Sequence, residues 1–225
     1  MPYSSDSPSR SSDIRFGEFV TLIALLMGLT ALSIDIMLVA LPNIAQTYAI
    51  AQPNDRQLIV TAYLVGFAVG QPFHGPLSDR FGRKPVLAAG LVIFALGALA
   101  SLFAPSYATM LAARAVQGFG AAAPRVIAIA IVRDRFAGRH MARVMSFVMM
   151  VFIIVPILAP TIGEAIMWVA DWRSIFGFLF AVGVLALAWT AFRLPETRSV
   201  ADRLPLSAGT LASTFATVVT NRKTL

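Results

Sequence analysis

Six stretches of the sequence are long and apolar enough to cross a lipid bilayer as helices. Crossing the hydrocarbon core takes about 20 predominantly apolar residues. The six stretches are residues 19–41, 58–77, 86–103, 107–132, 144–169 and 174–192. The predicted fold class is therefore all-α, a polytopic membrane protein whose core is a bundle of six transmembrane helices.

The composition supports a membrane protein and excludes several other classes. Hydrophobic residues make up 58% of the 225 residues and charged residues only 13%, whereas soluble domains carry about 25% charged residues. The net charge of +7 comes from basic residues in the loops rather than on one soluble face, so we expect no nucleic-acid partner. The sequence has no cysteine, which excludes disulfides, thiol chemistry and cysteine-based metal sites.

The distribution of basic residues predicts the orientation in the membrane. Fourteen Lys and Arg residues lie in the two ends of the chain and in the second and fourth loops, against two, Arg56 and Arg173, in the other loops. Positively charged loops stay in the cytoplasm, so we expect both ends of the chain there. The basic fourth loop contains Asp134-Arg135-Phe136, which echoes Asp79-Arg80-Phe81 of the second loop. We interpret this echo as chance.

These observations divide the chain into three parts. We predict a cytoplasmic tail at residues 1–18, a six-helix transmembrane domain at 19–193 and a cytoplasmic linker at 194–225. Within the linker, residues 207–219 are rich in Ala, Thr and Val. Two interpretations of this segment stay open, a short interfacial helix or a loosely ordered connection.

The second loop, residues 75–85, reads GPLSDRFGRKP and is the most distinctive short segment of the chain. Its four charged residues are Asp79, Arg80, Arg83 and Lys84. Gly75 and Gly82 allow a tight backbone, and Pro85 suits the first turn of the helix that follows. Asp79 can cap a helix end or pair with a neighbouring arginine. We therefore predict a compact charged turn on the water side of the membrane.

Four ionisable residues lie inside the predicted spans, where a charge costs at least a few kcal/mol. They are Asp35, Arg114, Arg125 and Glu164. At about 1.5 Å of rise per residue, Asp35, Arg114 and Glu164 all lie about 10 Å below the outer ends of their helices. We expect them to share one layer and, in a lone bundle, to face its open side. Intramembrane charges of this kind are candidates for function by default.

Each of these charges leaves more than one interpretation open. Asp35 is a proton-binding carboxylate or an anchor for a cationic substrate, and otherwise a buried ion-pair partner of Arg114. Arg125 lines the same cavity, or it snorkels or binds a free carbonyl. Glu164 is a second proton site, or a substitution that weakens close packing.

The fifth apolar stretch contains two prolines within a membrane helix. Pro156 and Pro160 remove backbone hydrogen bonds and favour a bend, and Gly163 follows one turn later. We therefore predict a hinge at Pro156, Pro160 and Gly163.

Several of these segments resemble the major facilitator superfamily of transporters. The pattern G-x-x-x-D-R-x-G-R-K-P of residues 75–85 resembles the loop between the second and third helices of that family. The pattern R-x-x-Q-G-x-G of residues 114–120, with Arg114 and Gln117, resembles its fourth-helix motif. The fifth stretch is similar to the antiporter motif in part, because Ala159 and Glu164 stand where glycines are expected.

Asp35 followed by A-L-P-x-I-A at residues 40–45, together with the basic run at 131–136, looks most like the Bcr/CflA-type drug-efflux branch. The resemblance implies proton-coupled export of small organic compounds across the inner membrane of a bacterium, by rocking of two six-helix halves. It associates Arg114 with proton coupling. The candidate residues for proton coupling or substrate binding are Asp35, Arg114, Gln117, Arg125 and Glu164. It assigns residues 75–85 to a conformational gate, through Gly75, Asp79, Arg80, Gly82, Arg83 and Lys84. The lipid bilayer, protons and a small organic substrate are the implied partners.

The chain departs from the family in length, because family members have about twelve spans and this sequence shows six. One expectation is a half transporter that pairs with a second six-helix half or a second copy. The alternative is a truncated membrane protein that does not transport, or an interaction subunit. An enzyme is not expected, since we find no nucleophile with a base, no metal-ligand cluster and no phosphate-binding loop, and we predict no cofactor.

Overall fold

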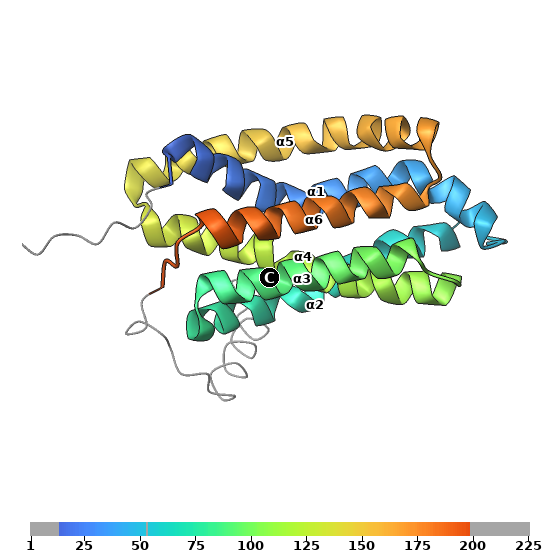
Figure 1. The fold of residues 1–225 in the computed structure, drawn as a ribbon, viewed down its shortest axis with the longest axis horizontal. Coiled ribbons are helices and arrows are strands. Elements are labelled where there is room, and N and C mark those ends of the chain that lie inside the picture. The colour runs from blue at the N-terminus through green and yellow to red at the C-terminus, as the bar shows by residue number, and fades with distance from the viewer. Residues whose placement is uncertain (1–13, 53, 199–225) are drawn as a thin grey trace, which may run out of the picture.

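The computed structural model describes residues 14–52 and 54–198, and the described part of the chain is a bundle of six long helices (Figure 1). The helices are α1 (Phe16–Thr47), α2 (Leu58–Phe81), α3 (Arg83–Leu102), α4 (Tyr107–Arg135), α5 (Gly138–Val169) and α6 (Arg173–Arg193), with a short 3-10 helix η1 (Asp55–Gln57) before α2. All six are long and apolar enough to cross a membrane. The prediction of an all-α, six-helix membrane protein is confirmed.

Most of the predicted tail and linker lie outside the described residues, and so does the segment 207–219. Within the described part, several helices extend beyond the apolar stretches that predicted them. α1 begins at Phe16 and ends at Thr47, and α5 begins at Gly138. Hydropathy marks only the part of a helix that crosses hydrocarbon, whereas backbone hydrogen bonds continue the helix into water.

The predicted turn at residues 75–85 is wrong in its extent. α2 continues through Gly75 and Pro76 to Phe81, and α3 begins at Arg83, so Gly82 alone separates the two helices. Gly82 has φ of 100°, a backbone conformation that residues with a side chain rarely adopt. Gly75 therefore contributes no turn. Pro85 lies in the first turn of α3, as predicted.

The helices are arranged in two layers. α4 packs mainly against α2 and α3, α1 packs mainly against α5, and α3 also packs against α6. In Figure 1, α6 lies over α1 and α3 lies over α4, while α5 and α2 occupy opposite edges of the bundle. α1 and α4 are therefore central, and their sequences are the most deeply buried of the six.

Close backbone contact places α4 between its two main neighbours. A Cβ atom added to Gly118 would lie 2.0 Å from the backbone oxygen of Tyr63 in α2. On the adjacent face, a Cβ atom added to Gly120 would lie 2.3 Å from the backbone nitrogen of Phe94 in α3. Small residues of this kind let membrane helices approach closely enough for their backbones to touch.

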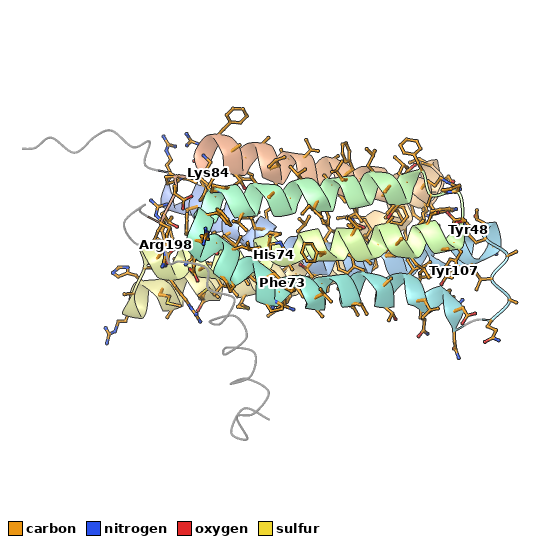
Figure 2. The ribbon with its side chains drawn as sticks, turned by 90° about the horizontal axis from the view of Figure 1, so that it is seen from below. Tyr48, Phe73, His74, Lys84, Tyr107 and Arg198 are labelled. Atoms are coloured by element: carbon orange, nitrogen blue, oxygen red, sulfur yellow. The ribbon has the colours of Figure 1, made fainter. Side chains whose placement is uncertain are left out.

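The bundle has a basic end and an aromatic end, which lie at opposite ends of the helices in Figure 2. The basic end holds the start of α1, the α2–α3 and α4–α5 turns and the end of α6. There the Arg193 guanidinium binds Glu18 with two hydrogen bonds, Nε to Oε1 at 2.6 Å and Nη2 to Oε2 at 2.7 Å. This pair joins the last helix to the first.

The aromatic end is closed by side chains that connect the three loops there. The Tyr48 hydroxyl donates to the Ala104 carbonyl at 2.8 Å, and Trp172 Nε1 donates to the Thr47 hydroxyl at 3.0 Å. The Tyr48 ring also contacts the rings of Tyr107 and Trp172. Partial burial raises the pKa of the Tyr48 phenol, so this hydroxyl remains a donor across the physiological range.

The two edge helices expose large apolar side chains. Val65, Val69 and Phe73 are exposed on α2, and Ile153 and Ile157 are exposed on α5. In water such faces would be unfavourable, whereas in a membrane they can contact lipid or further apolar helices. The edges of the bundle are therefore the surfaces available for contacts outside this chain.

The contact between α4 and α2 predicts that adding one methyl group at Gly118 lowers the stability of the bundle. We expect Gly118→Ala to lower the free energy of unfolding by about 1–3 kcal/mol, the usual cost of overpacking, because its Cβ meets rigid backbone. Gly177→Ala is the matched control, because a Cβ added in that part of α6 meets nothing within 4 Å. Unfolding in mixed detergent micelles measures both, and equal losses in the two variants would contradict the packing argument.

Candidate functional site

Arg114 lies in the middle of the bundle and is fully buried. Its Nη1 donates to Gln117 Oε1 at 2.6 Å, and its Nη2 donates to the backbone carbonyl of Ser33 in α1 at 3.2 Å. The guanidinium carbon lies 4.5 Å from the centre of the Tyr63 ring in α2 and 5.9 Å from that of Phe176 in α6. Four helices therefore meet around one cation, which is held by dipoles and aromatic faces.

No carboxylate within the described residues forms an ion pair with Arg114. Several buried polar atoms of the same region also lack hydrogen-bond partners, namely Arg114 Nε, Gln117 Nε2, Tyr63 Oη and Thr30 Oγ1. Burying a cation without a counter-ion and leaving polar groups unpaired both cost free energy. A site with this cost is better explained by function than by stability.

Asp35 lies two residues from the α1 contact of Arg114 but does not bind Arg114. The backbone oxygen of Ser33 accepts a hydrogen bond from Arg114. Ser33 precedes Asp35 by two residues, so the side chains of Ser33 and Asp35 leave α1 in nearly opposite directions. Asp35 is partly buried, and its carboxylate makes neither a hydrogen bond nor an ion pair within residues 14–52 and 54–198. The alternative that Asp35 and Arg114 form a buried ion pair is therefore wrong for this structure.

The face of α1 that carries Asp35 continues into a pocket near the aromatic end. Leu38 and Pro42, one and two turns further along α1, line this pocket of about 350 Å³ together with Arg56 and Thr61. Asp35 therefore lies one helical turn below this pocket on the same face of α1, and it is not among the residues that line the pocket.

Glu164 and Arg125 take different positions from Arg114. Glu164 is exposed on α5 and makes no ion pair with the described part of the chain. Arg125 is partly buried, and its guanidinium carbon lies 4.8 Å from the centre of the Phe152 ring, so it bridges α4 and α5. Both interpretations of Arg125, lining the cavity or snorkelling and binding a carbonyl, stay open. Arg114 points into the bundle, so the expectation that it faces the open side together with Asp35 and Glu164 is wrong.

The contacts nevertheless bring these residues to a similar depth. A Cβ added to Gly163 would lie 3.0 Å from the backbone oxygen of Ile36, so α5 and α1 are in contact at this depth. Glu164 and Asp35 are the sequence neighbours of these two residues. Gly163 thus serves close packing of α5 on α1. Pro156 and Pro160 lie inside α5, which is continuous through both. Their role as a hinge stays a prediction.

The basic end holds a second polar cluster, centred on Arg83. Its side chain is only 8% exposed, and its Nη1 lies 2.8 Å from Asp79 Oδ1 and 2.6 Å from Ser78 Oγ. Its Nε donates to Asp134 Oδ2, at the end of α4, at 3.0 Å. Asp79 therefore pairs with Arg83, one of its two predicted partners. Arg80 is exposed instead, with its guanidinium over the ring of Phe81.

The chain after α6 completes this cluster. Glu196 accepts hydrogen bonds from the backbone nitrogens of Arg83 at 2.9 Å and Lys84 at 3.1 Å, where α3 begins. Gly82 has no side chain with which to cap α3, so a carboxylate from a distant segment does so. Lys84 Nζ in turn donates to the carbonyl of Ala191 in α6 at 2.7 Å. In Figure 2, Lys84 and Arg198 both lie at the basic end.

Two further contacts fix the segment after α6 to the same cluster. The Thr197 hydroxyl donates to Asp134 Oδ2 at 3.2 Å, and Arg198 Nη1 lies 3.5 Å from Asp79 Oδ1. The cluster therefore joins α2, α3, α4 and the end of α6. It is well placed to hold the basic end in one conformation.

Sequence reasoning missed most partners of both clusters. It named Arg114 and Gln117 but not Tyr63, Ser33 or Phe176, which come from other helices and carry no local signal. It interpreted Asp134-Arg135-Phe136 as a chance echo, whereas Asp134 is a direct partner of Arg83. The repeat of Asp-Arg-Phe in the second and fourth loops was the sequence signal that could have identified Asp134 as part of this cluster.

The Arg83 cluster predicts a difference between two neighbouring arginines. Arg83→Ala leaves the Asp79 and Asp134 carboxylates facing each other, and we expect it to lower the free energy of unfolding by about 2 kcal/mol. Breaking a fully buried pair costs roughly 3–5 kcal/mol, and these carboxylates are partly exposed. Arg80→Ala, in the same turn, should change stability little. Chemical unfolding in detergent compares them, and an equal effect of both would contradict this role of Arg83.

Comparisons with known proteins agree with the geometry. The family model described as Major Facilitator Superfamily matches residues 23–222. The chain is 38% identical to an uncharacterized MFS-type transporter YdgK of Bacillus subtilis, over 89% of this chain and 51% of that protein. It is 36% identical to a bicyclomycin resistance protein homolog of Haemophilus influenzae, over 88% of this chain and 49% of that one. It is 38% identical to the multidrug resistance protein MdtL of Escherichia coli, over 75% and 43%.

Solved structures show the same fold. The human organic anion transporter MFSD10 (TETRAN) matches with a TM-score of 0.73 at 22% identity, over 87% of this chain and 52% of that one. The proton:xylose symporter XylE matches with a TM-score of 0.69 at 18% identity, over 80% and 45%. The chain spans about half the length of the curated relatives it matches. It belongs to the Major Facilitator Superfamily, and its relatives agree with the Bcr/CflA-type drug-resistance branch of that family.

Proposed function

We propose that this chain is one six-helix half of a transporter that exports small organic compounds in exchange for protons, by alternating access. Membership of the Major Facilitator Superfamily supports transport, and relatives named for resistance to bicyclomycin and to multiple drugs support export. The observation that carries the proposal is Asp35, an unpartnered carboxylate within the apolar stretch of α1.

Asp35 is proposed as the proton-binding group. An ionised carboxylate without a partner is costly at membrane depth, and a bound proton removes that cost. A change in the exposure of Asp35 to water would therefore change its proton occupancy. Arg114 binds the backbone of the same stretch of α1, two residues before Asp35, and is proposed to take part in the coupling. Gln117 holds the guanidinium in place.

Other charged groups leave room for a substrate role. Asp35 can equally anchor a cationic compound, because the same carboxylate can exchange a proton for an organic cation. Glu164 is exposed on α5 at a similar depth and is a second candidate for either role. Arg125 lies on the α4–α5 side of the same region, beside Phe152.

The Arg83 cluster is proposed as the gate at the basic end. Its ion pairs hold α2, α3, α4 and the segment after α6 together, and alternating access requires such contacts to break and re-form. Pro156 and Pro160 are proposed to let α5 bend during this motion, since each removes a backbone hydrogen bond.

A second six-helix half is proposed as the partner, either on a separate chain, as a second copy, or as part of a longer chain. The exposed apolar faces of α2 and α5 support this, as does the half-length match to relatives. We further propose that the protein lies in a bacterial inner membrane with its basic end in the cytoplasm.

Substitution of the carboxylate tests the proposed coupling. In cells or proteoliposomes where the complete transporter exports a compound, Asp35→Asn should abolish export driven by a proton gradient. The amount of membrane-inserted protein should stay unchanged. Glu164→Gln is the comparison variant, because Glu164 is the second candidate for the same role at similar depth. Full export by Asp35→Asn would contradict the role of Asp35 and favour Glu164.

Cysteine labelling tests the proposed orientation. The chain has no cysteine, so Asn54→Cys, at the aromatic end, and Ala137→Cys, in the α4–α5 turn, each supply one exposed thiol. In intact cells an impermeant thiol reagent should label Asn54→Cys and spare Ala137→Cys until the cells are opened. The reverse pattern would place the basic end outside and overturn the topology.

A further inference from the structure

Five buried side-chain atoms in the part of the chain that the structure describes form no hydrogen bond, and four of them surround one guanidinium. These four are Arg114 Nε, Gln117 Nε2, Tyr63 Oη and Thr30 Oγ1, and the fifth is Thr190 Oγ1. A buried polar group without a partner costs free energy. The transport scheme above gives Tyr63 and Thr30 no role, so their hydroxyls need another explanation.

Contacts around Arg114 bring the first three of these atoms together. Gln117 Oε1 accepts from Arg114 Nη1 at 2.6 Å, so Nε2 of the same amide lies beside the guanidinium. Because arginine only donates, the amide atom that faces it is the oxygen, and the amide nitrogen is left without a partner. The centre of the Tyr63 ring lies 4.5 Å from the guanidinium carbon. The backbone of Tyr63 is held in place by its close contact with Gly118 of α4.

The hydroxyls of Tyr63 and Thr30 belong to the same region. The Tyr63 hydroxyl lies within electrostatic reach of the Ser33 and Thr30 hydroxyls but forms no hydrogen bond with either. Ser33 Oγ donates to the Leu29 carbonyl of its own helix at 2.7 Å, which is a common arrangement for a helical serine or threonine. Thr30, one turn earlier on α1, makes no such bond although it is buried. Its hydroxyl is therefore free for a ligand between α1 and α2.

The four atoms specify this ligand by what they donate and accept. Arg114 Nε and Gln117 Nε2 are donors only, whereas the two hydroxyls both donate and accept. Nitrogens that carry protons cannot ligate a metal ion. A water molecule can accept from the nitrogens and exchange hydrogen bonds with the hydroxyls, and buried waters make about three such bonds. An anion only accepts, and burying an ion costs far more free energy than immobilising a water molecule.

We propose that a buried water molecule binds where α1, α2 and α4 meet, held by the hydroxyls of Tyr63 and Thr30, and that it accepts a hydrogen bond from Arg114 Nε. Gln117 Nε2 completes the site. The water supplies the oxygen that the guanidinium lacks on this side, so Arg114 keeps its charge at membrane depth without a carboxylate. This inference rests on the buried atoms alone and does not depend on transport.

Tyr63→Phe tests the site, because it removes the hydroxyl and keeps the ring. In a dry site, loss of an unpartnered hydroxyl leaves a protein equally stable or more stable. With water bound, we expect the equilibrium constant for unfolding of the purified chain in detergent micelles to rise about fivefold, the effect of losing one hydrogen bond. Tyr48→Phe calibrates this value, since the Tyr48 hydroxyl donates one hydrogen bond to Ala104. An unchanged or lower constant for Tyr63→Phe would overturn the proposal.

Thr30→Val and Thr190→Val are a matched pair, because both remove a buried, unpartnered hydroxyl. Thr190 lies about 21 Å further along α6 than Phe176, the α6 residue that contacts Arg114, at about 1.5 Å per residue. Thr30→Val should raise the unfolding constant about fivefold, and it should add little to Tyr63→Phe, because both act through one water. Thr190→Val should leave the constant unchanged or lower. Equal effects of the two threonine variants, or full additivity of Thr30→Val with Tyr63→Phe, would contradict the shared site.

Nuclear magnetic resonance of the chain with isotope-labelled arginine detects the water directly. We expect a nuclear Overhauser effect between water and the Nε–H of Arg114 in the parent protein, and we expect Tyr63→Phe to lose it. Its absence from the parent would refute the water site. Stabilisation of the parent by chloride relative to gluconate at equal ionic strength, lost in Tyr63→Phe, would also refute it, because the ligand would then be an anion.

Discussion

The bundle depends on direct backbone contact between α4 and its two neighbours. Gly118 meets α2 and Gly120 meets α3 at distances that leave no room for a side chain. Lipid tails are as apolar as the helices, so burial of apolar surface gives little reason for helices to associate in a membrane. Close packing supplies that reason here. Because α4 is fixed on two sides, the side chain of Arg114 on its remaining face points at α1 rather than at lipid.

The position of Arg114 shows how a charge can be kept at membrane depth without a counter-ion. The guanidinium is distributed over an amide oxygen, a backbone carbonyl and two aromatic rings, each of which contributes a little. A carboxylate in the same place would lock the cation into one stable pair. The arrangement seen here leaves Asp35 without that partner and the local polar groups incompletely satisfied. Such a site can change partners at low cost.

Hydropathy was sufficient to predict six membrane helices, and the charge pattern offered Arg83 as one of two possible partners of Asp79, because both features depend on residues close together in the sequence. The extent of α2 was not predictable in this way, since Gly75 and Pro76 favour a turn in isolation and are held in a helix by packing. The partners of Arg114 come from α1, α2 and α6, and Glu196 reaches α3 from far along the chain. Contacts of this kind depend on the tertiary arrangement, which no local pattern encodes.

The ion pair between Glu18 and Arg193 holds the start of α1 beside the end of α6 at the basic end. The polypeptide therefore leaves the bundle next to the place where it enters. A second bundle joined directly before α1 or directly after α6 would start from the same end of this one, so the order of two such bundles along a gene is not constrained by reach. Circular permutation, with new termini in one of the turns at the aromatic end, would need only a short bridge between α6 and α1.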